Sequence, residues 1–233
     1  LGISCRRAVG TDMCLNSLRL GETFRREHGL SRVQFMQMNL FRPIFAPGEF
    51  DVVLCNGVLH HTADPYGGFR SILSLVKPGG YIVIGLYNTY GRLFTDARRQ
   101  LFRLTRGGAK WVDPVLRQTG LSDGKRKAWF ADQYQHPHES KHTFGEVLGW
   151  FRDNGVEFVR GVPALRPDDD GLEGVGLFGP QPAGTSLEHF IVQASEIFAP
   201  GQREGGFFIM IGRRPAEARP RRTPTPELVA SGL

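Results

Sequence analysis

The chain has 233 residues, 40% of them hydrophobic, and a formal net charge of +6. This length and hydrophobic content suit one α/β domain with an appended part. No run of eighteen apolar residues is present, so we expect no membrane span. Cys5, Cys14 and Cys55 show no paired metal spacing. They favour a reducing, cytoplasmic compartment over a disulfide framework.

The first forty residues alternate between strand and helix patterns. Residues 7–12 read as a short strand that ends on Asp12, and the spacing of apolar residues over 15–28 predicts a helix closed by Gly29. Residues 33–38 read as a second strand, ending at Asn39. This alternation predicts a parallel sheet with right-handed crossovers.

The run from Phe50 to Thr62 is the most informative part of the chain. Its first half is apolar without alternation, which is typical of a strand buried on both faces of a parallel sheet. It then changes to Asn56, Gly57 and the pair His60 and His61. Ligands of open α/β sheets bind at the carboxyl ends of the strands, so this polar cluster is a candidate site.

The remaining elements continue the α/β pattern. A helix over 65–76 leads through Lys77-Pro78-Gly79-Gly80 into a strand over 81–87, and residues 92–135 form a helical insertion rich in Arg and aromatic residues. Thr143 and Glu146 form a capping box, in which Glu146 is expected to bind back to the cap residue. That helix ends at 154–155; a strand over 156–162, a loop over 166–184, a helix over 186–198 and a strand over 207–211 follow.

The order and spacing of these pieces resemble one family. The strand beginning Phe50-Asp51, the Leu59-His60-His61 loop, the helix opening with Asp64-Pro65 and the Pro78-Gly79-Gly80 turn are similar to class I S-adenosylmethionine-dependent methyltransferases. The resemblance is strongest to the group of the quinone-biosynthesis C-methyltransferases. It implies a Rossmann-like sheet with flanking helices, S-adenosylmethionine as cofactor, and late strands that are antiparallel at one sheet edge.

The resemblance also divides the chain. It implies a cofactor-binding core over 1–91, an acceptor cap over 92–142 inserted after strand five, and the rest of the core over 143–212. The Pro- and Arg-rich residues 213–233 read as a disordered basic tail.

One expected feature is missing. The acid that binds the ribose lies about 20 residues after a Gly-rich loop, and counting back from Asp12 passes residue 1. No Gly-x-Gly-x-Gly occurs elsewhere, and the chain begins without Met. We therefore expect the C-terminal part of a methyltransferase whose first strand and first helix lie upstream. Its sheet would have two unpaired edges where that strand belongs, and it would bind S-adenosylmethionine weakly or not at all.

The resemblance assigns cofactor contacts to the ends of three strands. Asp12 would bind the ribose hydroxyls, Asn39 the adenine amino group, and Asn56 the ammonium group. Each has a simpler alternative: Asp12 as a helix N-cap, Met13 as core filler, and Asn39 as a strand-end cap. The full candidate set is Asp12, Met13, Asn39, Leu40, Asn56 and Gly57.

Four residues are candidates for the acceptor side. His60 or His61 could act as general base, because imidazole titrates near neutral pH; the alternative is one packed His and one that lines the site. Tyr87 and Asn88 end the following strand, where a plain turn is the alternative. No third ligand lies near the His pair, so we expect no metal there. Residues 136–142 are read as a surface turn or a lid rather than a metal site.

The resulting prediction is a methyltransferase that acts on a small acceptor. The basic stretch over 92–110 is read as a solvated helix face, so nucleic acid is not expected as a partner, although its Arg content suggests an anionic acceptor. A non-catalytic S-adenosylmethionine- or nucleotide-binding module is one alternative, and a dehydrogenase that binds a nicotinamide cofactor is another. The sequence leaves the acceptor and the oligomeric state open.

Overall fold

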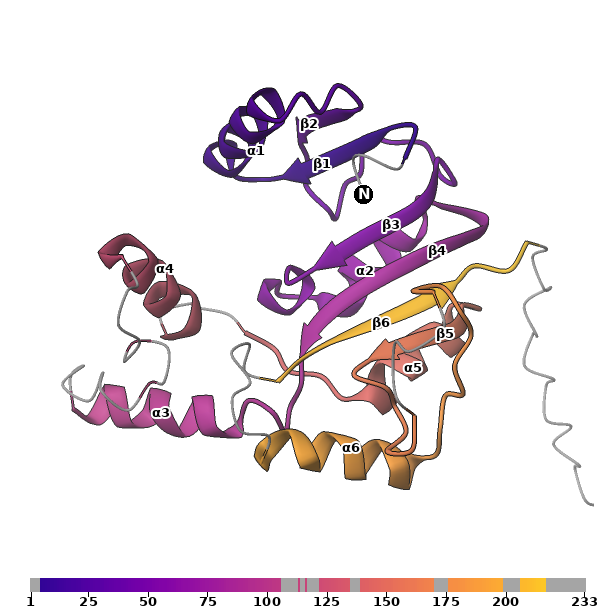
Figure 1. Cartoon of the computed structure of the whole chain (residues 1–233). Helices are drawn as coiled ribbons and strands as arrows, with labels where there is room; N and C mark the ends of the chain where they lie inside the picture. The colour runs from indigo at the N-terminus through magenta and orange to yellow at the C-terminus, as the bar shows by residue number, and fades with distance from the viewer. Residues whose placement is uncertain are drawn as a thin grey trace, which may run out of the picture.

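The structure of the protein is a computed structural model that describes residues 5–105, 113, 116, 122–134, 139–169, 176–198 and 206–216. Its strands lie in two sheets with helices packed beside them (Figure 1). The strands are β1 (Ala8–Asp12), β2 (Val33–Gln37), β3 (Phe50–Asn56), β4 (Val76–Tyr87), β5 (Glu157–Val162) and β6 (Phe207–Arg213). The helices are α1 (Leu15–Glu27), α2 (Pro65–Leu73), α3 (Leu93–Leu104), α4 (Asp123–Tyr134), α5 (Phe144–Asp153) and α6 (Ser186–Phe198), with a short 3-10 turn, η1 (Leu59–His61).

The smaller sheet is a single β-α-β unit. β1 and β2 pair in parallel from Ala8 with Val33 to Asp12 with Gln37, and α1 connects them. The Phe35 ring fills the space left by two glycines, because a Cβ at Gly10 or Gly21 would lie 2.6 or 2.7 Å from it. The Phe35 ring therefore packs against both β1 and α1.

The larger sheet has the strand order β3-β4-β6-β5. β3 and β4 are parallel, whereas β6 is antiparallel to both β4 and β5. The expected antiparallel late strands at the sheet edge are thus confirmed. Both faces of β4 are covered, and α2, α5 and α6 contribute to a core of fully or nearly buried side chains that includes Leu59, Phe69, Ile82, Ile84, Leu86, Phe144, Phe151, Leu165, Phe208 and Met210.

The break between the two sheets lies between β1 and β3. Within the described residues no strand ladder joins them, so each presents one unpaired edge (Figure 1). The predicted pair of open edges is confirmed. The second face of β3 is also uncovered: Leu54 is 52% exposed, whereas Val53 and Cys55 pack against the core.

The boundary between α2 and β4 differs from the sequence prediction. The helix ends at Leu73 rather than at residue 76, and the strand begins at Val76 rather than at residue 81. Lys77–Gly80 form an irregularity inside the strand, since Phe50 pairs with Val76 while Val52 already pairs with Tyr81. Gly79 has φ +80°, which suits glycine there, and Lys77 binds Asp51 at 2.9 Å.

The two helices of the predicted insertion, α3 and α4, follow β4 directly. Residues 217–233, most of the predicted tail, lie outside the described residues. None of the helices among the described residues is long and apolar enough to cross a membrane.

Candidate functional site

The carboxyl end of β1 carries the first two predicted cofactor residues. Asp12 is exposed, and its Oδ1 accepts a hydrogen bond from the Cys14 amide at 2.8 Å. The N-cap of α1 is Cys14 rather than Asp12, so the simpler reading of Asp12 as an N-cap is wrong. Met13 is 60% exposed, and its carbonyl accepts from Gln37 Nε2. The core-filler reading of Met13 is therefore wrong too.

The turn after β2 holds the second pair. Asn39 is exposed and its Oδ1 accepts from the Phe41 amide at 2.9 Å, which is the local capping interaction expected as the alternative. Leu40 is half-buried against the core, and its carbonyl accepts from Ser71 Oγ at 2.6 Å. Asn39 is exposed, and its ligand role stays a prediction.

The end of β3 has a geometry that depends on two glycines. The exposed Asn56 side chain lies over Gly85 of β4, where an added Cβ would fall 1.7 Å from Asn56 Oδ1. Gly57 has φ +76° and no atom within 4 Å of its missing Cβ. The Asn56 side chain can therefore lie over β4 only because residue 85 has no Cβ. Gly57 adopts the positive φ of the turn, and the space beside its own α-carbon is open.

The histidine pair lies in η1, directly after this turn. His60 is 1% exposed and His61 is half-buried, and their Nε2 atoms are 3.1 Å apart. The His60 ring stands 4.2 Å from the Tyr87 ring. His60 is thus the packed histidine of the pair, whereas a site-lining role for His61 stays a prediction.

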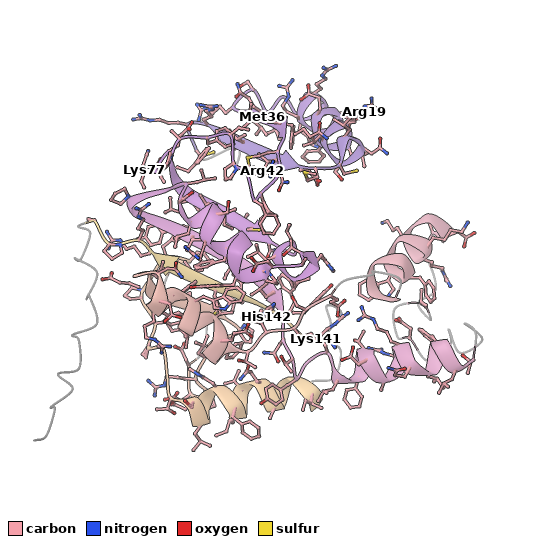
Figure 2. The ribbon with its side chains drawn as sticks, turned by 180° about the vertical axis from the view of Figure 1, so that it is seen from behind. Arg19, Met36, Arg42, Lys77, Lys141 and His142 are labelled. Carbon is pink, nitrogen blue, oxygen red and sulfur yellow. The ribbon has the colours of Figure 1, made fainter. Side chains whose placement is uncertain are left out.

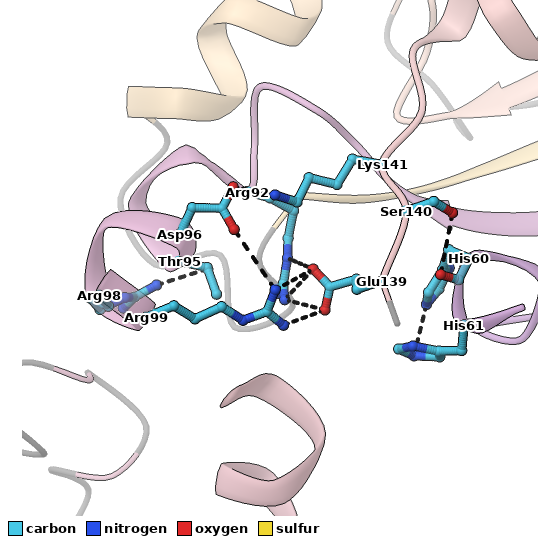
Figure 3. Close-up of polar contacts among 10 residues, drawn as sticks. All are labelled: His60, His61, Arg92, Thr95, Asp96, Arg98, Arg99, Glu139, Ser140 and Lys141. Atoms are coloured by element: carbon cyan, nitrogen blue, oxygen red, sulfur yellow. Dashed lines mark hydrogen bonds and ion pairs between the residues drawn. The ribbon is translucent and has the colours of Figure 1, made fainter. Parts of the chain in front are cut away.

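A buried ion cluster adjoins the pair, and the sequence did not predict it. The Arg92 guanidinium lies 4.1 Å from the centre of the Tyr87 ring and donates to both Glu139 carboxylate oxygens at 2.9 Å. Arg99 donates to the same carboxylate at 2.5 Å (Figure 3). The side chains of Arg92 and Glu139 are 0% and 2% exposed. Arg92 and Glu139 lie far apart in the sequence, so no local sequence pattern predicts this ion pair.

The segment after Glu139 is attached to the histidine loop. The Ser140 amide donates to the His60 carbonyl at 2.8 Å, and the His142 amide donates to the Tyr87 carbonyl at 2.9 Å. His142 lies beside the end of the larger sheet, and Lys141 extends from it toward α3 (Figure 2), where it binds Asp96. This part of the predicted lid is thus a fixed strap across the ends of β3 and β4.

Two further predictions in this region concern Asn88 and the capping box of Thr143 and Glu146. Asn88 is 1% exposed; its Nδ2 donates to Gln193 of α6, and its Oδ1 accepts from the Tyr90 amide. The Thr143 hydroxyl accepts from the Glu146 amide as predicted. The Glu146 carboxylate, however, accepts from His142 Nδ1 at 2.9 Å.

Metal ligation gains no support from the part of the chain that the structure describes. No group of three His, Cys, Asp or Glu side chains there could hold an ion. Residues 136–138 of the predicted lid or metal segment lie outside that part.

The arrangement of strand ends agrees with what comparison with known proteins finds. Residues 2–84, from before β1 to the middle of β4, match the family described as "Methyltransferase domain". Over this segment the chain is similar to class I methyltransferases. The matched segment contains Asp12, Asn39, Asn56 and the histidine pair, and their roles stay predictions.

The relatives of this chain are moderately similar to it. An uncharacterized protein of Synechococcus sp. is 27% identical over 59% of this chain and 38% of its own length. A protein of Albidiferax ferrireducens named ubiquinone biosynthesis O-methyltransferase is 30% identical over 39% of this chain and 36% of its own length. The protein of that name from Bordetella pertussis is 25% identical, over 55% and 54%. The matches thus span only about a third to a half of these relatives.

Solved structures show the same fold at low sequence identity. The structure of PKMT2 from Rickettsia typhi superposes with a TM-score of 0.59 at 12% identity, over 88% of this chain and 43% of that one. The [4+2]-cyclase SpnF superposes with a TM-score of 0.51 at 16% identity, over 93% and 70%. A cyclase among the neighbours shows that the fold alone does not define the reaction.

Proposed function

We propose that this chain binds S-adenosylmethionine and transfers its methyl group to a small acceptor. The observation that carries the proposal is the placement of exposed polar side chains at the carboxyl ends of parallel strands, Asp12 after β1, Asn39 after β2 and Asn56 after β3, in a segment that is similar to the methyltransferase domain family. Ligands of such sheets bind at these ends.

The donor and acceptor chemistry of these residues suits that cofactor. The Asp12 carboxylate has acceptor capacity beyond its bond to Cys14 and can take both ribose hydroxyls. Asn39 can pair with the adenine amino group and Asn56 with the ammonium group. Gly57 permits close approach of a ligand to the backbone, because the space beside its α-carbon is open. Met13 and Leu40 flank these positions.

Acceptor chemistry belongs to the histidine end of the site. When bound, the cofactor supplies an electrophilic methyl group, so the protein mainly aligns the nucleophile and excludes water. The relatives named O-methyltransferases favour an oxygen nucleophile. A hydroxyl loses its proton as the new bond to carbon forms, and we assign that proton to His61, which the buried His60 ring orients at 3.1 Å.

Tyr87 and Asn88 have unequal parts in this proposal. Tyr87 contacts His60 and Arg92, so it contributes to the wall beside the base. Asn88 uses both ends of its side chain to hold α6 and the turn after β4. We therefore propose that Asn88 shapes the site without touching the acceptor.

The open edges of β1 and β3 set a condition on this function. The cofactor would lie across the two sheets, yet no described strand connects them. We infer that strong binding requires a further strand between β1 and β3. We expect titration calorimetry to give weak or undetectable S-adenosylmethionine binding to residues 1–233, and at least tenfold tighter binding to a version extended by the preceding residues of its gene. Equal affinities would contradict this inference.

The same titration tests the site residues. In the extended protein, Asp12→Ala and Asn56→Ala should each weaken binding about tenfold or more, because each removes a charged or polar hydrogen-bond partner. The matched control is Asp51→Ala, an exposed acid at the opposite end of β3, which should leave affinity unchanged. Binding without formation of S-adenosylhomocysteine in the presence of candidate phenols and alcohols would favour the non-catalytic binding module.

A further inference from the structure

Ser140 has one hydroxyl hydrogen and two acceptors within reach. Its Oγ lies 2.8 Å from His142 Nε2 and 3.2 Å from the His60 carbonyl oxygen (Figure 3). A hydroxyl donates its hydrogen to only one acceptor at a time. The Ser140 amide donates to the same carbonyl at 2.8 Å, so the strap stays attached to η1 whichever acceptor the hydroxyl uses.

Glu146 sets the tautomer of His142. The His142 side chain is nearly buried, and its Nδ1 lies 2.9 Å from Glu146 Oε1. A carboxylate can only accept, so Nδ1 carries a hydrogen and donates it. Nε2 of the neutral ring then has no hydrogen and accepts from the Ser140 hydroxyl. Neutral His142 therefore keeps the hydroxyl hydrogen away from the His60 carbonyl.

Protonation of His142 reverses this arrangement. An imidazolium ring has a hydrogen on both nitrogens, so Nε2 becomes a donor to Ser140 Oγ. The hydroxyl hydrogen must then turn to the other acceptor, the His60 carbonyl at 3.2 Å. Both contacts already exist, so the exchange needs only a rotation of the hydroxyl. Imidazole changes its charge between about pH 5 and 8, which makes both states accessible.

Glu146 is the one charged group paired with the His142 ring among the residues that the structure describes. From the same helix the Trp150 ring contacts it, with the ring centres 5.1 Å apart. The strap contributes Ser140, whereas the neighbouring Lys141 forms its ion pair with α3. The bonds of His142 to the end of β4 come from its backbone. A change in the charge of the ring therefore acts on Glu146 and Ser140.

We propose that His142 is a positioning residue for η1, and that its protonation transfers the Ser140 hydroxyl hydrogen bond to the His60 carbonyl. This carbonyl belongs to the peptide that joins His60 to His61, so the added bond fixes that peptide and the side chain that follows it. The strap then holds His61 more firmly at acidic pH. The part of His61 as a base rests on the proposed function, whereas the exchange of hydrogen bonds does not.

Hydrogen exchange of the 233-residue chain, followed residue by residue by NMR, tests the proposal. The reporters are the amides of His61 and Thr62, which donate to carbonyls of the same turn at 3.0 Å, and the Ile84 amide of β4 is the reference. Ser140→Ala removes the hydroxyl but keeps the backbone bond. It should lower the protection of the reporters about fivefold near pH 5, the effect of one hydrogen bond, and very little near pH 8.

Three further variants separate this exchange from a general loss of structure. Ser140→Thr keeps a hydroxyl and should behave like the parent. His142→Phe keeps a ring beside Trp150 but cannot gain a proton, so the hydroxyl should bind the carbonyl at every pH and raise the protection near pH 8 to the acid level. The matched control is Thr143→Ala, which removes the cap of α5 and leaves the contacts of His142 in place. Its reporters should keep the pH dependence of the parent.

Three outcomes would overturn the proposal. One is reporter protection in the parent that does not change with pH, and another is an equal effect of Ser140→Ala at both pH values. The third is loss of the pH dependence in Thr143→Ala, because fraying of α5 would then explain it. If the extended protein forms no S-adenosylhomocysteine while the exchange behaves as expected, the proposed function is contradicted and the hydrogen-bond exchange at His142 is supported.

Discussion

The β1-α1-β2 unit and the four-stranded sheet are built from similar sequence patterns but differ sharply in how they are packed. None of the thirteen residues of α1, all of them described, is buried, whereas α2 buries Phe69, Ile72 and Leu73. Leu20 and Phe24 of α1 are 73% and 55% exposed. The difference teaches that the four-stranded sheet rests on its own core, whereas the β1-α1-β2 unit has apolar surface that is still uncovered.

The largest effect that tests this comparison comes from two phenylalanines, one in each region. Phe69→Ala should lower the free energy of unfolding by about 3–5 kcal/mol, since its fully buried ring contacts Trp150 and Phe151. Phe24→Ala should change it by less than about 0.5 kcal/mol, because that ring is largely in water. Guanidinium unfolding followed by circular dichroism measures both. Similar losses for the two variants would show that α1 is covered in solution.

A smaller effect is expected from two glutamates that each bind two arginines. Glu139 binds Arg92 and Arg99 in a buried place, whereas Glu22 binds Arg25 and Arg26 on the surface of α1. Glu139→Gln should cost about 2–3 kcal/mol, because it leaves two buried or half-buried cations with a neutral amide. Glu22→Gln should shift the unfolding midpoint very little, since water screens exposed pairs.

The ion pairs of Glu22 also predict how the stability of the protein depends on pH. Hydrogen bonds from Arg25 and then Arg26 lower the pKa of Glu22 to about 2 from an ordinary value of 4.5. A lowered folded-state pKa contributes stability above the unfolded-state value, and this contribution is lost as the pH falls from 4.5 toward 2. The loss should be slight and should disappear in Glu22→Gln. If the parent and Glu22→Gln both lost the same large amount of stability between pH 4.5 and 2, this result would contradict the exposed character of α1.

The fold could be predicted largely because its signals are local. The change from apolar residues to Asn56-Gly57 marked the end of β3, the apolar run over 207–211 marked β6, and α6 was predicted to its last residue. The error at the start of β4 has a physical cause. Pro78 and Gly79 normally end a strand, but here they form a bulge that Lys77 fixes through Asp51. A turn inside a strand cannot be distinguished from a turn before one by composition.

The candidate site was less predictable because its contacts cross the chain. His60 and His61 were recognised from their position after a strand. The orientation of His60 depends on Tyr87 and Ser140, which lie 27 and 80 residues away. Glu139 was interpreted only as part of a surface turn or a lid, although it is the centre of the buried ion cluster. Burial of a charge depends on partners that no local pattern reveals.

The smallest test uses two cysteines, one in each region. Burial raises the pKa of the Cys55 thiol to about 11, whereas hydrogen bonds from the Ser17 amide and hydroxyl lower the pKa of the exposed Cys14 thiol below its ordinary 9.0. At pH 8 the thiolate fraction of Cys55 is only about one in a thousand, and the thiolate is the reactive form. Iodoacetamide should therefore label Cys14 at least tenfold faster than Cys55, with little effect on stability. Mass spectrometry of timed digests measures both rates.

Two further observations make the cysteine test decisive for the comparison of regions. In urea the two thiols should react at similar rates, because the environments that separate their pKa values are lost. Because the folded-state pKa of Cys55 is raised, its contribution to stability is complete below pH 9 and is lost as the pH rises toward 11.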